Sequence, residues 1–209
     1  MSEVVAFFDF DGTLTHGDSL LPFLRMVRGT PRFVMDIVAV SPYLAAYTLR
    51  MLRNDVAKEA LLQQSIGGLS IEHLREHGAQ FSKNEIPTLL REDVYARLRS
   101  HQQQGHCCVL VSASLDVYLE PWAKIAGFEY CIASSMAVSP EGLVTGKING
   151  ANCHGQEKVL RIKRLLSEIG LPARTYAYGD TSGDIPMIAM ADEGYWVKDG
   201  IRPFIKFKS

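Results

Sequence analysis

The chain has 209 residues, of which 47% are hydrophobic and 22% are charged, and its formal net charge is −1. This length allows one sizeable core with a small appended module. The composition excludes an intrinsically disordered chain and a protein that binds nucleic acid through a basic surface.

The cysteines and the first residues of the chain indicate the cellular compartment in which the protein resides. None of the four cysteines forms a Cys-x-x-Cys pair, so we expect reduced thiols in the core. Acidic residues occur within the first dozen positions, and no basic segment precedes an apolar stretch as in a secretory signal. We therefore expect a cytoplasmic protein; the cysteines are Cys107, Cys108, Cys131 and Cys153.

The first chemical signal is an Asp-Phe-Asp-Gly-Thr segment that begins at Asp9, directly after the apolar run 4–8. If that run is a buried strand, its period of two directs Asp9 and Asp11 to the same side, and Gly12 lets the chain turn away. One carboxylate could then attack phosphorus, while the other supplies a proton to the leaving oxygen. A strand that ends in a solvated acidic turn is the alternative.

Residues 16 to about 104 are predicted to be helical, with almost no strand signal. Thr30 followed by a proline is typical of a helix N-terminus, and Ser70 is expected to cap a helix over 71–83. Gly105 is expected to end the last of these helices.

Within this region, the stretch 33–52 could be mistaken for a membrane span because it is so apolar. Its uncharged interval between Asp36 and Arg50 is shorter than the roughly 18–20 residues that cross a bilayer, and Pro42 interrupts it. We expect a helical hairpin or a kinked buried helix here, and no membrane partner. A lipid-facing surface is the alternative.

After residue 105 the pattern changes to alternating strands and helices. We predict strands over 107–111 and 176–178, and helices over 115–126, 156–169 and about 184–191. Such alternation is typical of an α/β fold, here a three-layer, doubly wound parallel sheet of the Rossmann-like kind. Residues 1–15 and 105–209 would form the catalytic core, and 16–104 an inserted all-helical cap.

In open sheets of this kind the ligand site lies beyond the carboxyl ends of the strands, where Asp9, Ser112 and Asp180 are all predicted to fall. Ser112 offers a small hydroxyl and free backbone N–H groups at the entry to a helix, which is a ready anion site. Lys158, near the start of a helix, opposes the helix dipole, so a phosphate partner would explain it. The alternatives are that Ser112 only caps the following helix and that Lys158 is a solvated surface lysine.

Asp180 and Asp184 lie in an acid-rich loop after a predicted strand. Together with the first two acids they would repel one another strongly unless a cation lay among them. Hard oxygen ligands and a phosphate substrate favour Mg²⁺. For Asp184 alone, capping of the next helix is the alternative.

The order of these motifs resembles the haloacid dehalogenase superfamily of phosphatases, and the match spans Asp9 to Asp184. Helices inserted directly after the first motif, with Val-Ser-Ala-Ser and Gly-Gln-Glu-Lys-Val later, are most similar to the phosphoserine-phosphatase-like branch (subfamily IB type). That branch carries a helical cap of the C1 type. The resemblance implies an enzyme, a phosphoric monoester hydrolase.

The resemblance also assigns roles to single residues. Asp9 would be the nucleophile and a metal ligand, and Asp11 the general acid/base whose backbone carbonyl also binds Mg²⁺. Asp180 would bind the metal directly, and Asp184 would orient its water shell or Lys158. The phosphoryl oxygens would be held by Ser112, by Ala113, which stands where a glycine is common, and by Lys158.

Two departures concern the substrate. Asp18 occupies the position of a cap glutamate that binds the amino group in phosphoserine phosphatases, so it is the candidate specificity residue. The cap arginine that binds the substrate carboxylate has no single counterpart. His16, beside the cap entrance, could meet substrate or be an exposed turn residue. The candidate arginines are Arg25, Arg28, Arg50, Arg53 and Arg75.

We therefore expect a Mg²⁺-dependent phosphomonoesterase for a small cytoplasmic metabolite of the phosphoserine or histidinol phosphate type. It would act through an aspartyl phosphate. A phosphotransferase using the same intermediate and a lipid-phosphate phosphatase with an apolar cap are the alternatives, followed by a non-catalytic binding module. No nucleic-acid partner is expected.

Overall fold

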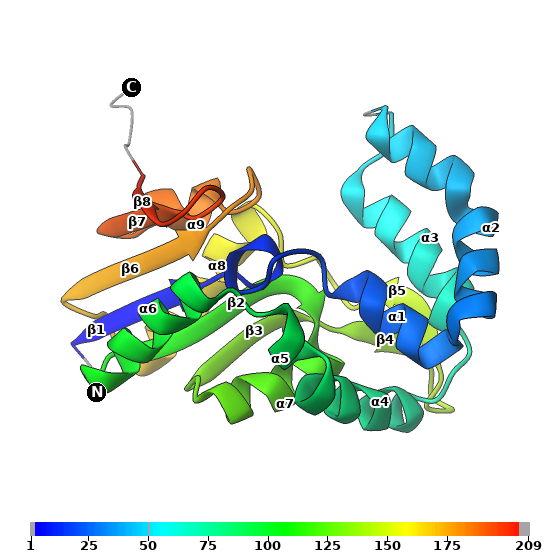
Figure 1. Ribbon diagram of the computed structural model, residues 1–209, viewed down its shortest axis with the longest axis horizontal. Coiled ribbons are helices and arrows are strands. Elements are labelled where there is room, and N and C mark those ends of the chain that lie inside the picture. The colour runs from blue at the N-terminus through cyan, green and yellow to red at the C-terminus, as the bar shows by residue number, and fades with distance from the viewer. Residues whose placement is uncertain (1–2, 50, 205–209) are drawn as a thin grey trace.

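The computed structural model describes residues 3–49 and 51–204. A lobe built on a β-sheet is joined to a smaller, mostly helical lobe that stands at one end of the sheet (Figure 1). The sheet has the strand order β3-β2-β1-β6-β7-β8, and every neighbouring pair is parallel except the antiparallel pair at the β8 edge. Its strands are β1 (Val4–Phe8), β2 (Cys107–Leu115), β3 (Tyr130–Ser134), β6 (Arg174–Gly179), β7 (Glu193–Trp196) and β8 (Arg202–Pro203).

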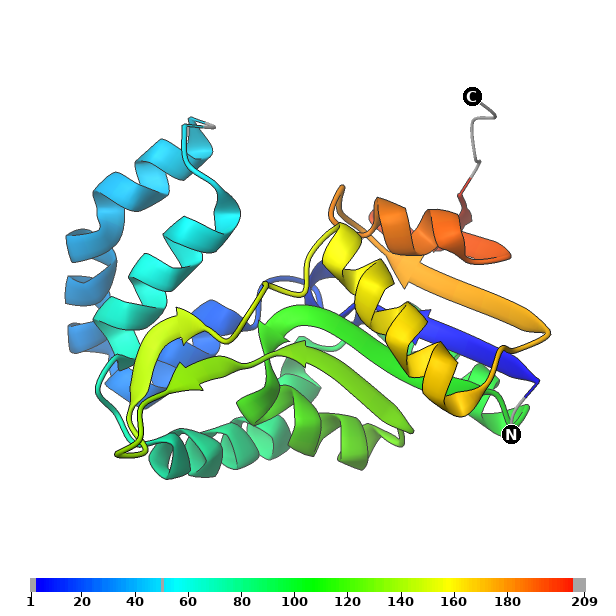
Figure 2. The ribbon, with the colours of Figure 1, turned by 180° about the vertical axis from the view of Figure 1, so that it is seen from behind.

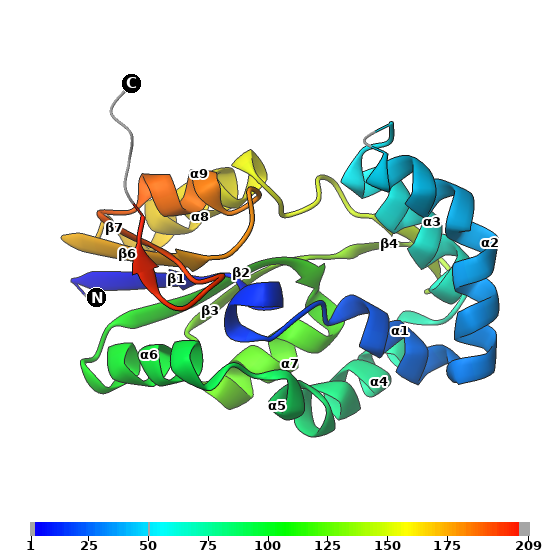
Figure 3. The same cartoon turned by 45° about the horizontal axis from the view of Figure 1, so that its top comes forward.

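Helices cover both faces of this sheet, which gives the three layers (Figure 3). Successive side chains of β1 point to opposite faces of the sheet, and each set packs against the helices on its own face. Val5 and Phe7 are buried in the cluster shared with α8 and α9, whereas Ala6 and Phe8 are buried in the larger cluster shared with α6 and α7. The predicted α/β fold is thus confirmed. These helices are α6 (Glu92–Gln103), α7 (Asp116–Ala126), α8 (Gln156–Ile169) and α9 (Ile185–Met190).

The predicted helical region, 16–104, forms six helices among the described residues: α6 and five that precede it along the chain. Ser70 caps its helix as predicted, because its Oγ accepts a hydrogen bond from the backbone N–H of His73. Thr30 is the first helical residue, and Gly29 occupies the cap position before it. The five helices before α6 are α1 (Leu20–Arg28), α2 (Thr30–Thr48), α3 (Asn54–Ile66), α4 (Ile71–Asn84) and α5 (Ile86–Leu89).

These helices separate into two groups in space. The helices α1, α2 and α3 form the outer lobe, while α4 packs along α7 beside the sheet (Figure 2). Phe81 of α4 and Tyr118 of α7 meet edge to face, with ring centroids 5.3 Å apart.

A β-hairpin that the sequence did not suggest also belongs to the outer lobe. Its strands, β4 (Met136–Val138) and β5 (Val144–Ile148), pair antiparallel and lie against α3. Gly146 has a φ of +78°, and a Cβ on it would lie 2.2 Å from the Cα of Gln63. The outer lobe therefore contains chain from both sides of residue 104.

Residues 33–48 of the apolar stretch lie in the single helix α2, which packs against α3. The predicted hairpin within the stretch is wrong, because the partner helix α3 begins only at Asn54. The alternative of a buried helix is wrong, because much of the apolar surface of α2 faces outward. None of the helices within 3–49 and 51–204 has both the length and the apolar character needed to cross a membrane. Arg50 lies outside the described residues.

Candidate active site

A cavity of about 570 Å³ lies at the carboxyl ends of β1 and β2 and is lined by residues of the sheet lobe and of the outer lobe. The structure brings most of the predicted site residues into this cavity. The lining residues that the sequence had singled out are Asp9, Asp11, Asp18, Ser112, Ala113, Lys158 and Asp184.

Asp9 enters the cavity directly after β1. Its backbone N–H donates to the carbonyl of Tyr178 in β6 at 3.0 Å, which fixes the end of the strand. The chain then makes a wide turn over Phe10–Leu14, in which Gly12 has a φ of +77°. A Cβ on Gly12 would lie 2.3 Å from Oδ2 of Asp180. A glycine is therefore needed for the two acidic loops to approach each other.

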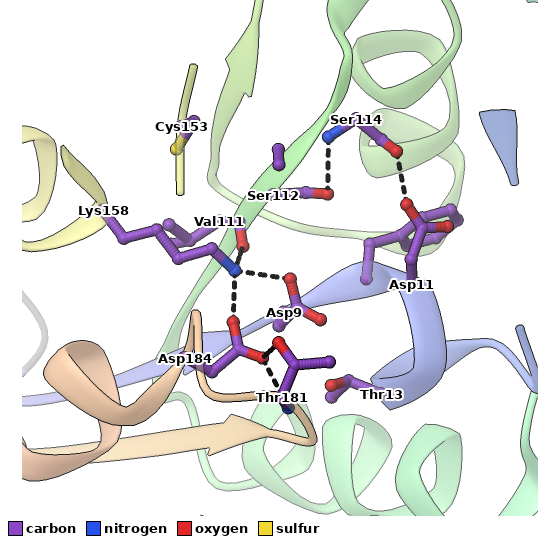
Figure 4. A network of polar contacts seen from close by, with 12 residues as sticks. Asp9, Asp11, Thr13, Val111, Ser112, Ser114, Cys153, Lys158, Thr181 and Asp184 are labelled. Atoms are coloured by element: carbon purple, nitrogen blue, oxygen red, sulfur yellow. Dashed lines mark hydrogen bonds and ion pairs between the residues drawn. The ribbon is translucent and has the colours of Figure 1, made fainter. Parts of the chain in front are cut away.

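Lys158 joins the two acidic loops (Figure 4). Its Nζ donates to Oδ1 of Asp9 at 2.5 Å, to Oδ1 of Asp184 at 2.6 Å and to the carbonyl of Val111 at 3.0 Å. Its side chain is 2% exposed. Lys158 is thus a buried cation held between two carboxylates, and the predicted alternative of a solvated surface lysine is wrong.

The charges of this triad are strongly coupled. Burial disfavours the ammonium, but the two carboxylates outweigh it and raise the pKa of Lys158 above its usual value. The same ammonium holds the pKa of Asp184 below its usual value against the effect of burial. Burial and the neighbouring charge of Asp184 raise the pKa of Asp9 to about 8. The ammonium of Lys158 opposes this rise, so a further positive charge beside Asp9 would favour its ionised form.

Asp11 reaches the same cavity from the turn. Because β1 ends at Phe8, the alternation of a strand does not place Asp11, as the sequence had suggested; the turn does. Its Oδ1 accepts from the backbone N–H of Ser19 at 2.7 Å, and its Oδ2 accepts from the hydroxyl of Ser114. Burial, followed by the charge of Asp18, raises the pKa of Asp11 to about 6. This value suits a group that both donates and accepts a proton near neutral pH.

Ser112 lies within β2, and the register with β3 shifts between Val111 and Leu115. The following helix begins at Asp116, so the prediction that Ser112 stands at a helix entry is wrong. The Ser112 hydroxyl accepts from the backbone N–H of Ser114 at 3.0 Å and is almost fully buried. An irregular strand end, not a helix N-terminus, presents these groups to the cavity.

Three of the acids form a group that could hold a cation. Asp9, Asp180 and Asp184 each offer a carboxylate oxygen, and these oxygens lie within 4.8 Å of one another. Oδ2 of Asp184 already accepts from the backbone N–H of Thr181 at 3.0 Å and from its hydroxyl at 2.8 Å. Asp180 accepts one hydrogen bond from Thr13 through Oδ1, at 3.1 Å. A partly buried set of hard oxygen donors beside this cavity fits Mg²⁺.

The substrate side of the cavity differs from the prediction. Asp18 lines it and also accepts from the backbone N–H of Leu21 at the start of α1. His16 lies in a separate hollow beside Asp180. None of the described candidate arginines lines the cavity; Arg28, for example, pairs with Asp36. The described candidates are Arg25, Arg28, Arg53 and Arg75.

Sequence reasoning missed Lys58, a cationic residue of the outer lobe that lines the cavity. From α3, its Nζ donates to the carbonyl of Ala113 at 2.5 Å and to Oδ1 of Asn152 at 3.2 Å. Burial lowers its pKa to about 8, although Asp11 and Asp18 oppose this effect. No local signal distinguishes Lys58 from an ordinary helix lysine, because its place depends on how the two lobes meet.

Comparison with known proteins identifies the family. The profile of the haloacid dehalogenase-like hydrolases matches residues 6–189, which cover nearly the whole chain. The chain belongs to this family. Protein CicA of Caulobacter vibrioides is 36% identical over 195 residues, which cover 92% of this chain and 86% of CicA.

Two further similarities extend this comparison. Phosphoserine phosphatase SerB1 of Mycobacterium tuberculosis is 27% identical over 192 residues, or 88% of this chain and 61% of SerB1. A crystal structure of a Bordetella pertussis protein of unknown function superposes with a TM-score of 0.78 at 25% identity, covering 91% of this chain and 88% of that one. The protein is a phosphatase of the haloacid dehalogenase-like family.

Proposed function

We propose that the protein is a Mg²⁺-dependent phosphomonoesterase that acts through an aspartyl phosphate on a small phosphorylated metabolite in the cytoplasm. The observation that supports this most directly is the contact of the buried Lys158 with Asp9, in a cavity that also holds Asp11. If Lys158 and Asp9 formed only a structural ion pair, a second acid that can exchange a proton, Asp11, would not be needed beside them. The cavity offers a nucleophile, a cation for phosphoryl oxygens and a proton donor together.

In the first step, a carboxylate oxygen of Asp9 attacks phosphorus and the bond to the ester oxygen breaks. Asp11 in its protonated form donates its proton to the departing oxygen. Lys158 and the backbone at Ser112 and Ala113 would hold the phosphoryl oxygens, whose negative charge needs stabilisation in the transition state.

In the second step, Asp11 removes a proton from water, and the water oxygen attacks the phosphorus of the aspartyl phosphate. The carboxylate of Asp9 leaves and inorganic phosphate is released. Bound Mg²⁺, held by Asp9, Asp180 and the backbone carbonyl of Asp11, would supply positive charge that keeps Asp9 ionised and neutralises the phosphate. Asp184 would position Lys158 and the water shell of the metal.

The outer lobe would supply the cap. We propose that the predicted cap, 16–104, acts through α1–α3, which lie over the cavity, so that cap opening admits the substrate. Asp18 and Lys58 carry opposite charges on this side of the cavity. A leaving group that bears both an amino group and a carboxylate, as serine does, would match both charges. Histidinol, which bears an amino group but no carboxylate, would match only Asp18. The sequence relationship to SerB1, which is named a phosphoserine phosphatase, agrees with this substrate class.

A panel of phosphorylated metabolites, assayed with Mg²⁺ and after treatment with EDTA, tests the function. We expect phosphate release that EDTA abolishes and added Mg²⁺ restores. Since binding of Mg²⁺ at about 100 times its Kd stabilises the native state by about 2.7 kcal/mol, the melting temperature should rise by roughly 5–10 °C. Turnover that is unchanged in EDTA would contradict the metal assignment, and transfer of the phosphoryl group to an added alcohol would favour a phosphotransferase.

Replacement of Asp11 by asparagine tests the acid/base assignment. We expect kcat/KM for an alkyl phosphate to fall about 10²–10⁴-fold, because an alkoxide needs a proton to depart. The loss should be smaller in the first step with p-nitrophenyl phosphate, whose leaving group needs no proton. A burst of one nitrophenol per enzyme should then precede slow hydrolysis, measured by stopped-flow absorbance. An equal loss for both substrates without a burst would contradict the assignment.

A further inference from the structure

The outward face of α2 is an apolar surface that the active site does not use. Met35, Val38 and Leu49 are 71%, 66% and 70% exposed, and Pro42 and Ala45 between them are also exposed. These five positions follow the spacing of one helical stripe. The opposite side of α2 faces the lobe through the buried residues Asp36 and Val40. We call the five-residue stripe the α2 face.

The helix lies at the outer edge of the molecule. In all three ribbon views α2 is the element of the outer lobe farthest from the sheet (Figures 1, 2 and 3). A partner could therefore approach the α2 face without meeting the sheet lobe.

No exposed charged side chain interrupts α2 between 33 and 49. Asp36 is the one ionisable carboxylate in this interval, and it is buried and paired with Arg28, with Nε and Oδ2 2.8 Å apart. Two hydroxyls bond within the helix: Ser41 donates to the carbonyl of Val38, and Thr48 donates to that of Ala45, both at 2.8 Å. In an environment poor in water, polar groups must form their hydrogen bonds within the protein, as these two hydroxyls do.

Basic residues stand at the ends of this uncharged interval. Arg32 is exposed in the first turn of α2, and Arg25 is exposed on the neighbouring helix α1. After the C-terminus of α2, Arg53 is exposed and pairs with Asp55. Tyr43 of α2 is also exposed, whereas Tyr47 lines the catalytic cavity. Apolar residues flanked by arginines and amphipathic rings are typical of a helix that lies in a membrane interface.

A protein partner fits this surface less well. Interfaces between proteins carry about one hydrogen bond per 100–200 Å², and the hydroxyls of Ser41 and Thr48 are already used within the helix. A coiled coil with a second copy needs at least three or four heptads with charged flanking positions, whereas α2 has 19 residues and Pro42 in its interior.

We propose that the α2 face docks on the surface of a bilayer that contains anionic lipids, with the helix parallel to the membrane plane. Met35, Val38 and Leu49 enter the boundary between headgroups and acyl chains, and the arginines near the N-terminus of α2 contact anionic headgroups. On the other side of the lobe, Leu44 and Tyr47 line the catalytic cavity. Docking therefore does not cover the catalytic cavity, and the chemistry at Asp9 does not depend on it.

Co-sedimentation of the full chain with vesicles tests this proposal. We expect binding to vesicles of phosphatidylcholine mixed with phosphatidylglycerol, and weaker binding to phosphatidylcholine alone or at high salt. The double variant M35E/V38E should bind at least about tenfold more weakly, because it loses two apolar anchors and adds two anions. Arg32→Gln should lose affinity for the anionic vesicles only.

The matched control is L160E/L171E, which adds the same two charges at residues that are 61% and 86% exposed on the sheet lobe. Because these two added charges lie away from the α2 face, the control should bind vesicles within about twofold of the wild type. Both double variants should keep the circular dichroism of the wild type and its phosphatase activity on soluble substrates. Vesicle binding and phosphatase activity are measured separately, so a failure of membrane docking can be distinguished from a failure of the proposed function.

Three results would overturn the proposal. The first is no binding of the wild type to anionic vesicles at low salt. The second is equal loss of binding in the two double variants, which would show only a charge effect. The third is a dimer in size-exclusion chromatography with light scattering that M35E/V38E alone dissociates, since a second copy would then cover the α2 face.

Discussion

The variant Asp9→Asn is expected to lower kcat/KM by at least about 10⁴-fold, because an amide cannot form the acyl phosphate. Asparagine keeps the shape of the side chain, so the cavity and the hydrogen bond to Lys158 need little rearrangement. Steady-state kinetics with saturating Mg²⁺ measure the loss. Radiolabelled or mass-detected phosphoprotein should form in the wild type after rapid acid quenching and be absent from the variant.

Although Asp9→Asn loses activity, we do not expect it to lose stability in parallel. The pKa of Asp9 in the folded, metal-free protein is raised to about 8, well above the usual value for an aspartate. Its contribution to stability is therefore fully present below about pH 4 and is lost as the pH rises toward 8. Asparagine has no proton to lose, so metal-free Asp9→Asn should become more stable than the metal-free wild type as the pH rises through this window.

The matched control for Asp9 is Asp199→Asn, an equivalent change at an exposed aspartate. It should retain wild-type kinetics and melting temperature. If Asp9→Asn kept more than a tenth of the wild-type rate, covalent catalysis by Asp9 would be wrong.

The variant Lys158→Met is expected to lose both activity and stability. The carboxylates of Asp9 and Asp184 would then be buried without the cation that contacts them. Removal of one partner of a buried ion pair costs about 3–5 kcal/mol, so the melting temperature should fall by roughly 10 °C. The kcat/KM should fall at least about 10³-fold, because phosphoryl oxygens lose a charged donor.

The pH dependence of this loss identifies its cause. In the wild type, Lys158 holds the pKa of Asp184 below its usual value, which stabilises the protein above that usual value and less so as the pH falls. The difference in free energy of unfolding between the wild type and Lys158→Met should therefore be larger at pH 7 than at pH 3, which lies below the usual pKa of an aspartate. Urea titrations at both values measure it.

A lysine on the same helix provides the control. Lys163→Met changes an exposed residue of α8 and should alter neither the stability nor the rate by more than a small amount. A pH-independent loss in Lys158→Met would indicate that lost packing, and not unpaired carboxylates, is responsible.

The sequence predicted the core elements well because their signals are local. The run Val4–Phe8 forms β1, and the segment Gln156–Ile169 forms α8 with the predicted bounds. The parallel sheet followed from the alternation of such segments. The strands β3, β7 and β8 and the hairpin β4–β5 were missed, because their stability comes from pairing with distant strands or packing on α3, which a short window does not show.

The residues that carry the proposed chemistry could also be selected from the sequence. A pair of acids, a lysine and two further acids follow a strand or begin a helix, and a serine lies near the end of β2. Parallel strands bring such positions to one edge of the sheet. What the sequence alone determined is therefore the α/β core and the identity of the groups gathered at its edge, since both depend on residue order.

Only the tertiary structure decided how these groups act on one another. The contacts of Lys158 with two carboxylates, the raised pKa of Asp9 and the entry of Lys58 from the outer lobe depend on distances between segments far apart in the chain. The exposure of α2 also depends on which of its faces the neighbouring helices cover. Burial and charge act through space, and the sequence records neighbours only along the chain.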